Sequence, residues 1–121
     1  MMAFDKNKEV IADMNTDQLW EGKRSDGVTL PDYSPVSVAV YGKPPGPIKL
    51  YDTGKFYRGI EAVAGRDQVD IIGNDSITAE LEQRYGGEII GLTEENEQDL
   101  KDNYIVPAMR EIIKKLINER L

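Results

Sequence analysis

The chain has 121 residues, with 15 basic and 22 acidic side chains, a net charge of −7, and neither histidine nor cysteine. A chain of this length is expected to form one domain, residues 1–121, with a modest core. The missing residue types exclude disulfides, thiolate metal sites and histidine-based catalysis. We therefore expect no enzymatic activity, no cofactor and no metal.

Charge and hydropathy narrow the possible partners. The acidic excess and the scattered basic residues argue against a dedicated duplex-DNA binder. No apolar run approaches the ~20 residues of a membrane span, so we expect no membrane contact. The first residues lack a secretory signal, which predicts synthesis in the cytoplasm.

The N-terminal part is predicted to form a helix over residues 4–21, because its apolar residues recur on one helical face. Residues 15–17, Asn-Thr-Asp, interrupt that face and can cap a new helix, so we expect a break there. Gly22 ends the segment. Trp20, the single tryptophan, is expected to anchor the core or an interface.

A long connection rich in Pro and Gly is predicted over residues 23–47. Within it, residues 36–41 alternate and are β-branched, which favours a short strand. Residues 43–48, which contain Pro44 and Pro45, are expected to form an exposed polyproline-like loop; a proline-motif ligand is the alternative. Connections of this length in compact domains commonly carry binding functions.

A β-hairpin is predicted over residues 58–73, preceded by one short turn. Its strands, residues 60–64 and 68–72, alternate so that one face points inward, and a connection containing Gly joins them. A short helix over residues 76–85 should follow, capped by the preceding Asn-Asp-Ser and ended by two glycines.

A long amphipathic helix is predicted over residues 93–121, with Thr93 as N-cap. Pro107 should kink or restart it near residues 105–106. Its regular apolar stripe is more typical of a helix docked on a sheet than of a membrane or partner helix. The far end, residues 113–121, has little else to cover and is expected to project to a neighbouring subunit. The predicted class is α+β: a small antiparallel sheet packed with an N-terminal helix and a long C-terminal helix.

Two carboxylate groupings were weighed as cation sites. The spacing Asp13-x-Asn15-x-Asp17 begins like a calcium loop, but Gln18 and Arg24 stand where glycine and glutamate are required, so a helix surface is expected. Magnesium-dependent hydrolysis would need three carboxylates around the second strand to lie close together; these are Asp67, Asp70 and Asp75. A solvated strand face is the simpler interpretation.

One stretch has no evident chemistry of its own: Leu50-Tyr-Asp52-Thr53-Gly54-Lys-Phe56-Tyr-Arg-Gly59-Ile60. Asp52 or Thr53 can cap the next turn, and Gly54 can adopt a positive φ angle. Together with its surroundings, this stretch resembles the tail-completion and head-to-tail joining proteins of tailed bacteriophages, the virion morphogenesis family. Members typically carry Leu-x-x-Thr-Gly-x-Leu/Phe-x-x-Ser/Gly-Ile before a β-hairpin.

Other segments resemble the same family in the same order. Upstream, Asn15-Thr-Asp-Gln18-Leu19-Trp-Glu-Gly22 is similar to an Asn-x-x-Gln-Leu-x-x-Gly element, and a Tyr33-Ser34 loop follows. Downstream, Tyr85-Gly86-Gly87 and Ile90-Gly91-Leu92-Thr93 are similar to a glycine-containing turn and a helix start. The ordered similarities span residues 15 to about 100.

The resemblance implies a virion structural protein at the head–tail junction, without catalytic residues, that assembles as a homo-oligomeric ring. Tail completion, terminator and neck connector remain open as subtypes. Implied partners are further copies of the chain and neighbouring portal, connector or tail proteins, with genomic DNA passing through the channel without specific binding. The candidate interface residues are Trp20, Tyr33, Pro44, Pro45, Asp52, Thr53, Gly54, Phe56, Ile113, Leu116 and Leu121.

A second hypothesis is a small acidic inhibitor or adaptor that binds a basic protein partner one to one. It requires acidic side chains on one continuous face, the candidates being Glu80, Glu82, Glu94, Glu95, Glu97 and Asp99.

Overall fold

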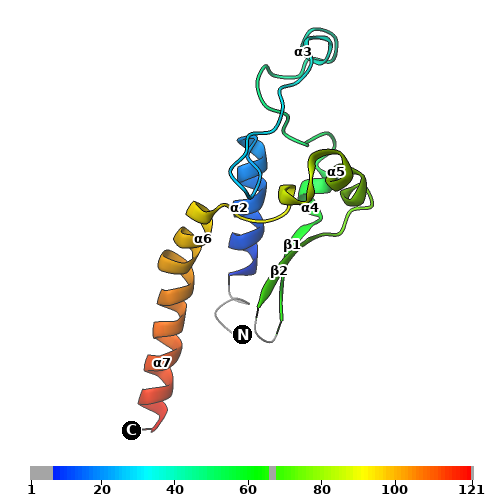
Figure 1. The fold of residues 1–121 in the computed structure, drawn as a ribbon. Coiled ribbons are helices and arrows are strands. Elements are labelled where there is room, and N and C mark those ends of the chain that lie inside the picture. Colours follow the sequence, from blue (N-terminus) through cyan, green and yellow to red (C-terminus); the bar gives the residue numbers. More distant parts are fainter. Residues whose placement is uncertain (1–6, 66–67, 121) are drawn as a thin grey trace.

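Helix α2 lies between a β-hairpin and a long C-terminal helix, and an arm extends from the C-terminal end of α2 (Figure 1). The computed structural model describes residues 7–65 and 68–120. The predicted α+β class is confirmed. In chain order the elements are α2 (Lys8–Trp20), α3 (Pro35–Tyr41), α4 (Lys55–Arg58), β1 (Ile60–Ala64), β2 (Val69–Gly73), α5 (Thr78–Tyr85), the 3-10 helix η1 (Gly87–Ile89), α6 (Glu94–Leu100), the π-helix η2 (Lys101–Ile105) and α7 (Val106–Arg120).

The predicted hairpin is confirmed. Strands β1 and β2 pair antiparallel, with Ala62 opposite Ile71. Alternate side chains point inward as expected: Ile60 and Ala62 are buried, while Val69 and Ile71 pack against the core. The connection at residues 66–67 lies outside the described residues. The inner face of the hairpin packs on α2, which shields it from water.

Two apolar clusters form the core, one towards each end of α2. The first joins α2, the hairpin and the C-terminal helix through Ile11, Ala62, Leu92, Leu100, Ile105 and Ala108. The second holds α4, η1 and the segments just before and after residues 31–48 against α2 through Leu19, Leu30, Phe56, Ile60 and Ile89, with Leu50 packed beside them. Because both clusters include residues of α2 and β1, these two elements are the centre of the fold.

Helix α2 is continuous from Lys8 to Trp20, so the expected break at residues 15–17 is wrong. The polar residues that interrupt the apolar face bind another part of the chain instead of ending the helix. Asn15 is 0 % exposed and Gln18 is 3 % exposed, and both side chains face the segment that links η1 to α6. Their hydrogen-bonding groups therefore have partners inside the protein, and the helix has no reason to end there. The expected start at residue 4 lies outside the described residues.

The two buried amides bind the backbone of that linking segment, and we call the pair the amide clamp. Asn15 Nδ2 donates to the Ile89 carbonyl at 3.1 Å, and Asn15 Oδ1 accepts from the Gly91 N–H at 2.7 Å. Gln18 Nε2 donates to the Gly91 carbonyl at 2.9 Å, and Gln18 Oε1 accepts from the Thr93 N–H at 2.8 Å. These bonds give partners to backbone N–H and C=O groups of a segment without regular secondary structure, and they fix that segment next to α2.

The strand expected at residues 36–41 is wrong, because these residues lie in helix α3. Ser34 Oγ accepts a hydrogen bond from the Ser37 N–H at 3.1 Å, and Pro35 occupies the first turn. A serine cap followed by proline is a strong helix start. The described residues place no strand beside this exposed segment, so the local signal outweighs the β-propensity of the valines.

The predicted long loop is an organised arm, residues 31–48, with α3 at its tip (Figure 1). Its two sides are paired at the base, where the Tyr33 N–H donates to the Gly46 carbonyl at 2.9 Å and the Ile48 N–H donates to the Pro31 carbonyl at 2.8 Å. Backbone pairing at the base gives the arm a defined direction.

The C-terminal helix carries the predicted irregularity at the predicted place. Thr93 caps α6, since its Oγ1 accepts from the Asn96 N–H at 3.2 Å. The π-helical turn η2 (Lys101–Ile105) ends two residues before Pro107. Because proline has no N–H to donate to the preceding turn, a widened turn there accommodates it without breaking the helix. The predicted restart near residues 105–106 is confirmed.

Candidate functional site

An apolar cleft of about 410 Å³ opens beside the stretch that resembles the joining proteins. Apolar side chains of that stretch and of the α5 region line it: Leu50, Tyr51, Phe56, Ile77, Leu81 and Tyr85. Charged residues of both signs also line it: Lys43, Asp52, Lys55, Asp75 and Arg84. A cleft of this kind suits an apolar side chain of a partner whose flanks are polar.

Gly54 explains the Thr-Gly pair of this stretch. Its φ angle is +85°, and an added Cβ would lie 2.9 Å from the Tyr51 hydroxyl and 2.8 Å from Arg58 Nη1. Only glycine lets the Tyr51 ring fold over this turn. Thr53 holds the turn from the other side, because its carbonyl accepts from Arg58 Nη1 at 3.3 Å.

Tyr51 belongs to an aromatic group that continues onto α2. Its ring meets the Trp20 ring edge to face at 5.7 Å and the Tyr57 ring at 5.0 Å. Lys49 Nζ lies 4.4 Å from the centre of the Trp20 ring and donates to the Trp20 carbonyl at 2.6 Å. Trp20 remains 51 % exposed, so it is no core residue, and it stays a candidate for an interface.

Burial raises the pKa of the Tyr57 hydroxyl well above its ordinary value, with smaller contributions from the nearby acidic groups Tyr33, Asp17 and Tyr51. The neutral hydroxyl donates to the Lys49 carbonyl at 2.6 Å, which a phenolate cannot do. The protonated form is thus the one that the folded chain favours.

From the raised pKa of the Tyr57 hydroxyl we expect the protein to lose stability at high pH. Its folded-state pKa lies above the unfolded value of about 10, so its contribution is complete below that pH and is lost as the pH rises further. Urea unfolding between about pH 9 and pH 11 should show a steeper decline for the wild type than for Tyr57→Phe. Tyr104→Phe, at an exposed position, should follow the wild type; equal slopes for all three would refute the role of Tyr57.

The remaining arm candidates surround the cleft or lie beyond it. The Tyr33 hydroxyl accepts from the Lys49 N–H at 3.1 Å, and the Tyr33 ring lines the cleft. Pro44 and Pro45 are exposed on the returning side of the arm. At the tip, α3 exposes apolar side chains that the sequence analysis did not select, namely Val36, Val40 and Tyr41, the last at 73 %.

The apolar stripe of α7 is only partly used by the fold. Ile105 and Ala108 are buried against the core and Ile112 packs beside them. Further along, Ile113 and Leu116 are 52 % and 53 % exposed. Figure 1 shows the C-terminal half of α7 running past the ends of α2 and the hairpin. The first half of the stripe thus docks, while the second half projects; Leu121 lies outside the described residues.

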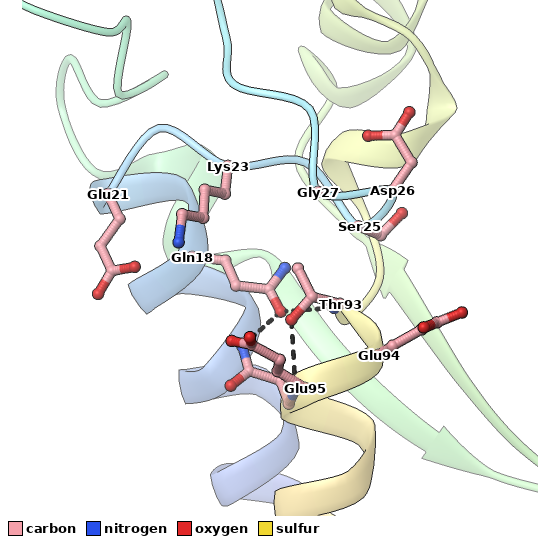
Figure 2. Close-up of a pocket in the computed structure, with 10 residues that line it drawn as sticks. Gln18, Glu21, Lys23, Ser25, Asp26, Gly27, Thr93, Glu94 and Glu95 are labelled. Carbon is pink, nitrogen blue, oxygen red and sulfur yellow. Dashed lines mark hydrogen bonds between the residues drawn. The ribbon is translucent and has the colours of Figure 1, made fainter.

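A groove runs between α2 and α6, formed by two hollows of about 430 and 590 Å³ that share Gln18, Glu21 and Asn96. We call it the α2–α6 groove. Figure 2 shows the larger hollow, with Glu21, which directly follows α2, and with Glu94 and Glu95 from α6 among its lining residues. The hydrogen bonds of Gln18 form part of its floor.

The smaller hollow is acidic around an apolar strip. Asp13, Asp17 and Glu21 follow one another at four-residue steps along α2, and Asp99 faces them from α6. Its apolar lining consists of Val10, Met14 and Tyr104. No basic residue lines this hollow among the described residues. The four-residue spacing of Asp13, Asp17 and Glu21 is the feature of the sequence that could have predicted this groove, because it places three acids on one helical face. The calcium-loop interpretation considered only the two-residue spacing of Asp13, Asn15 and Asp17.

Two of the three carboxylates considered for magnesium, Asp70 and Asp75, have separate hydrogen-bond partners. Asp70 is exposed on β2 and accepts from Gln68 Nε2 at 3.2 Å, and Asp75 accepts from the Ile77 N–H at 3.0 Å. Asp67 lies outside the described residues. Within residues 7–65 and 68–120, no three acidic side chains are grouped so that they could hold a metal ion. In the same part of the chain, no helix combines the length and the apolarity needed to cross a bilayer.

The described candidate residues other than Pro44 and Pro45 thus fall into two groups. The arm base and the joining-type stretch bring together Tyr33, Asp52, Thr53, Gly54 and Phe56 at the cleft, with Trp20 linked to them through Tyr51. Phe56 is buried and contributes the floor of the cleft. Ile113 and Leu116 lie on the projecting helix (Figure 1).

Comparison with known proteins places the chain in no family: no family model, no curated protein and no solved structure matches it.

Proposed function

We propose that this chain is a structural protein of a tailed-phage virion, placed at the head–tail junction and assembled as a homo-oligomeric ring. The observation that carries the proposal is the presence of two exposed apolar surfaces on one small chain. One is on α3 at the tip of the arm, and the other is on the projecting half of α7 (Figure 1). Surfaces of this kind mark contacts with other proteins.

The positions of the two surfaces favour a repeating assembly. They lie at opposite ends of the molecule (Figure 1). A contact between unlike surfaces of identical chains is head to tail, and it closes into a ring when the rotation between neighbours allows it. The resemblance of residues 50–60 to the joining proteins supports the head–tail junction as the place of such a ring.

The apolar cleft gives the proposed ring a second contact. Leu50 has a φ angle of +54°, which costs a bulky residue roughly 1–2 kcal/mol, and it turns its side chain towards the core. Strain maintained beside an open apolar cleft is consistent with a binding role. A neighbouring portal, connector or tail protein would insert an apolar side chain here.

A second candidate function is an acidic adaptor or inhibitor, in which no ring forms and no enzymatic activity is needed. It is favoured by the acidic α2–α6 groove, which would receive a basic segment of another protein. In the ring, by contrast, genomic DNA is expected to pass through the channel without specific binding.

Quantitative peptide mass spectrometry of purified particles distinguishes the two. The ring predicts this chain in mature particles at a copy number far below that of the major capsid protein. Absence from mature particles would remove the proposed virion role and leave the adaptor. The major capsid protein, measured in the same digest, is the internal standard.

A further inference from the structure

We propose that the projecting half of α7 from one copy of the chain docks in the α2–α6 groove of the next copy. The inference rests on the proposed ring and assigns its α7 surface to the groove of the next copy, which leaves the α3 surface for another protein of the particle. The two surfaces have complementary shapes, because one is a single exposed helix and the other is a groove between two helices.

The apolar parts correspond. On the helix, the exposed apolar side chains are Met109, Ile113, Leu116 and Ile117. With 100° between successive residues, they form one continuous stripe. In the groove, Val10, Met14 and Tyr104 supply an apolar strip between the two helices. Docking the stripe on the strip would remove both from water.

The charges also correspond. Arg110 and Lys114 border the α7 stripe on one side, while Lys115 lies on the other side beyond Ile112, which packs on the core. All three basic residues are exposed, as is Glu111 on the back of the helix. Asp13 and Asp17 on one wall of the groove would face them. The chain is acidic as a whole, with a net charge of −7, so this basic helix end is a local exception that fits its own groove.

Repulsion among the acidic side chains of the groove favours a basic partner. Asp13, Asp17 and Glu21 are like charges at four-residue steps on α2, an arrangement that destabilises a helix. A row of lysine and arginine side chains laid along them would turn this repulsion into attraction. A neutral apolar partner would leave the acids unpaired at the rim.

The contact cannot form within one copy. Helices α6 and α7 belong to one helical rod, so the groove wall at Asp99 and the stripe at Leu116 are separated along it by roughly 25 Å. The occupant of the groove must therefore come from another molecule. Because the two surfaces differ, the contact is head to tail and can repeat around a ring.

A charge-swap experiment on the full chain tests this contact. The helix variant is Lys114→Glu/Lys115→Glu, and the groove variant is Asp13→Lys/Asp17→Lys; all four positions are exposed, so folding should be retained. Sedimentation velocity at about 50 mM salt should show oligomers of the wild type, which dissociate as salt is added. Each variant alone should raise the dissociation constant about tenfold or more.

Mixing the two variants is the decisive step. The acidic helix of one variant fits the basic groove of the other, and the remaining pair is unchanged, so the mixture should regain the oligomers. The control Lys55→Glu/Arg84→Glu makes the same charge change as the helix variant but at the apolar cleft. Because the cleft is proposed to receive a different protein and not a second copy of this chain, the control should self-associate like the wild type.

The inference is overturned if the wild type is monomeric, if the mixture stays dissociated, or if the cleft variant loses association as strongly as the helix variant. Its failure is separable from that of the proposed function. A chain that is monomeric in solution yet present in particles refutes only this contact. A chain that forms the charge-swapped oligomer yet is absent from particles refutes only the virion role.

Discussion

Replacing Asn15 with alanine is expected to lower the free energy of unfolding by about 2–3 kcal/mol. The change leaves the Ile89 carbonyl and the Gly91 N–H without their partner in a site where Asn15 was 0 % exposed. A buried group that loses its hydrogen bond carries the full cost of its lost hydration. Urea unfolding followed by circular dichroism and by the fluorescence of Trp20 measures this loss.

Asn118→Ala is the matched control, because it makes the same change at an exposed position of α7. It should alter stability by less than about 0.5 kcal/mol. Gln18→Ala should resemble Asn15→Ala, since it removes the partner of the Gly91 carbonyl and of the Thr93 N–H. A loss for Asn15→Ala no greater than for Asn118→Ala would show that the amide clamp contributes nothing to stability.

Gly22→Ala is expected to destabilise the fold by about 3–4 kcal/mol, and Gly27→Ala by only about 1–2 kcal/mol. The two glycines have nearly the same φ angle, +82° and +81°. An added Cβ on Gly22 would lie 2.3 Å from Pro47 Cβ, whereas a Cβ on Gly27 would meet nothing within 4 Å. The difference between the variants therefore measures the contact between the end of α2 and the base of the arm.

The same pair of variants reports on the arm. If Pro47 must move away from residue 22, the paired base of the arm should open, and limited proteolysis should cut residues 31–48 faster in Gly22→Ala than in Gly27→Ala. Equal losses of stability in both variants would mean that the backbone conformation alone sets the cost. The close approach to Pro47 would then be of no consequence for the arm.

Local signals in the sequence predicted most elements correctly because they act over a few residues. The alternation in β1, the cap at Thr93 and the restart before Pro107 each depend on neighbours within about one or two turns. The wrong prediction at α3 also rested on local signals, which here contradicted one another. There the Ser34 cap and Pro35 favoured a helix while the valines favoured a strand, and no partner strand was present to decide for the strand.

The candidate site was harder to predict from the sequence. The stretch around Gly54 was identified, but the cleft beside it also needs Leu81 and Tyr85 of α5, which are distant in the chain. The α2–α6 groove was missed, because its acids at Asp13 and Asp17 were considered only as calcium ligands. A row of acids has no evident function until the facing helix is known.

The sequence by itself determined the α+β class, the hairpin and the amphipathic C-terminal helix, since periodicity and caps record which face of each element avoids water. Only the tertiary structure decided the role of Asn15 and Gln18. Whether a polar side chain on an apolar helix face ends the helix or binds a distant backbone depends on a partner far along the chain. Ile89, the partner of Asn15, is 74 residues away. The same holds for the projecting stripe of α7, because burial is a property of what the other elements leave uncovered.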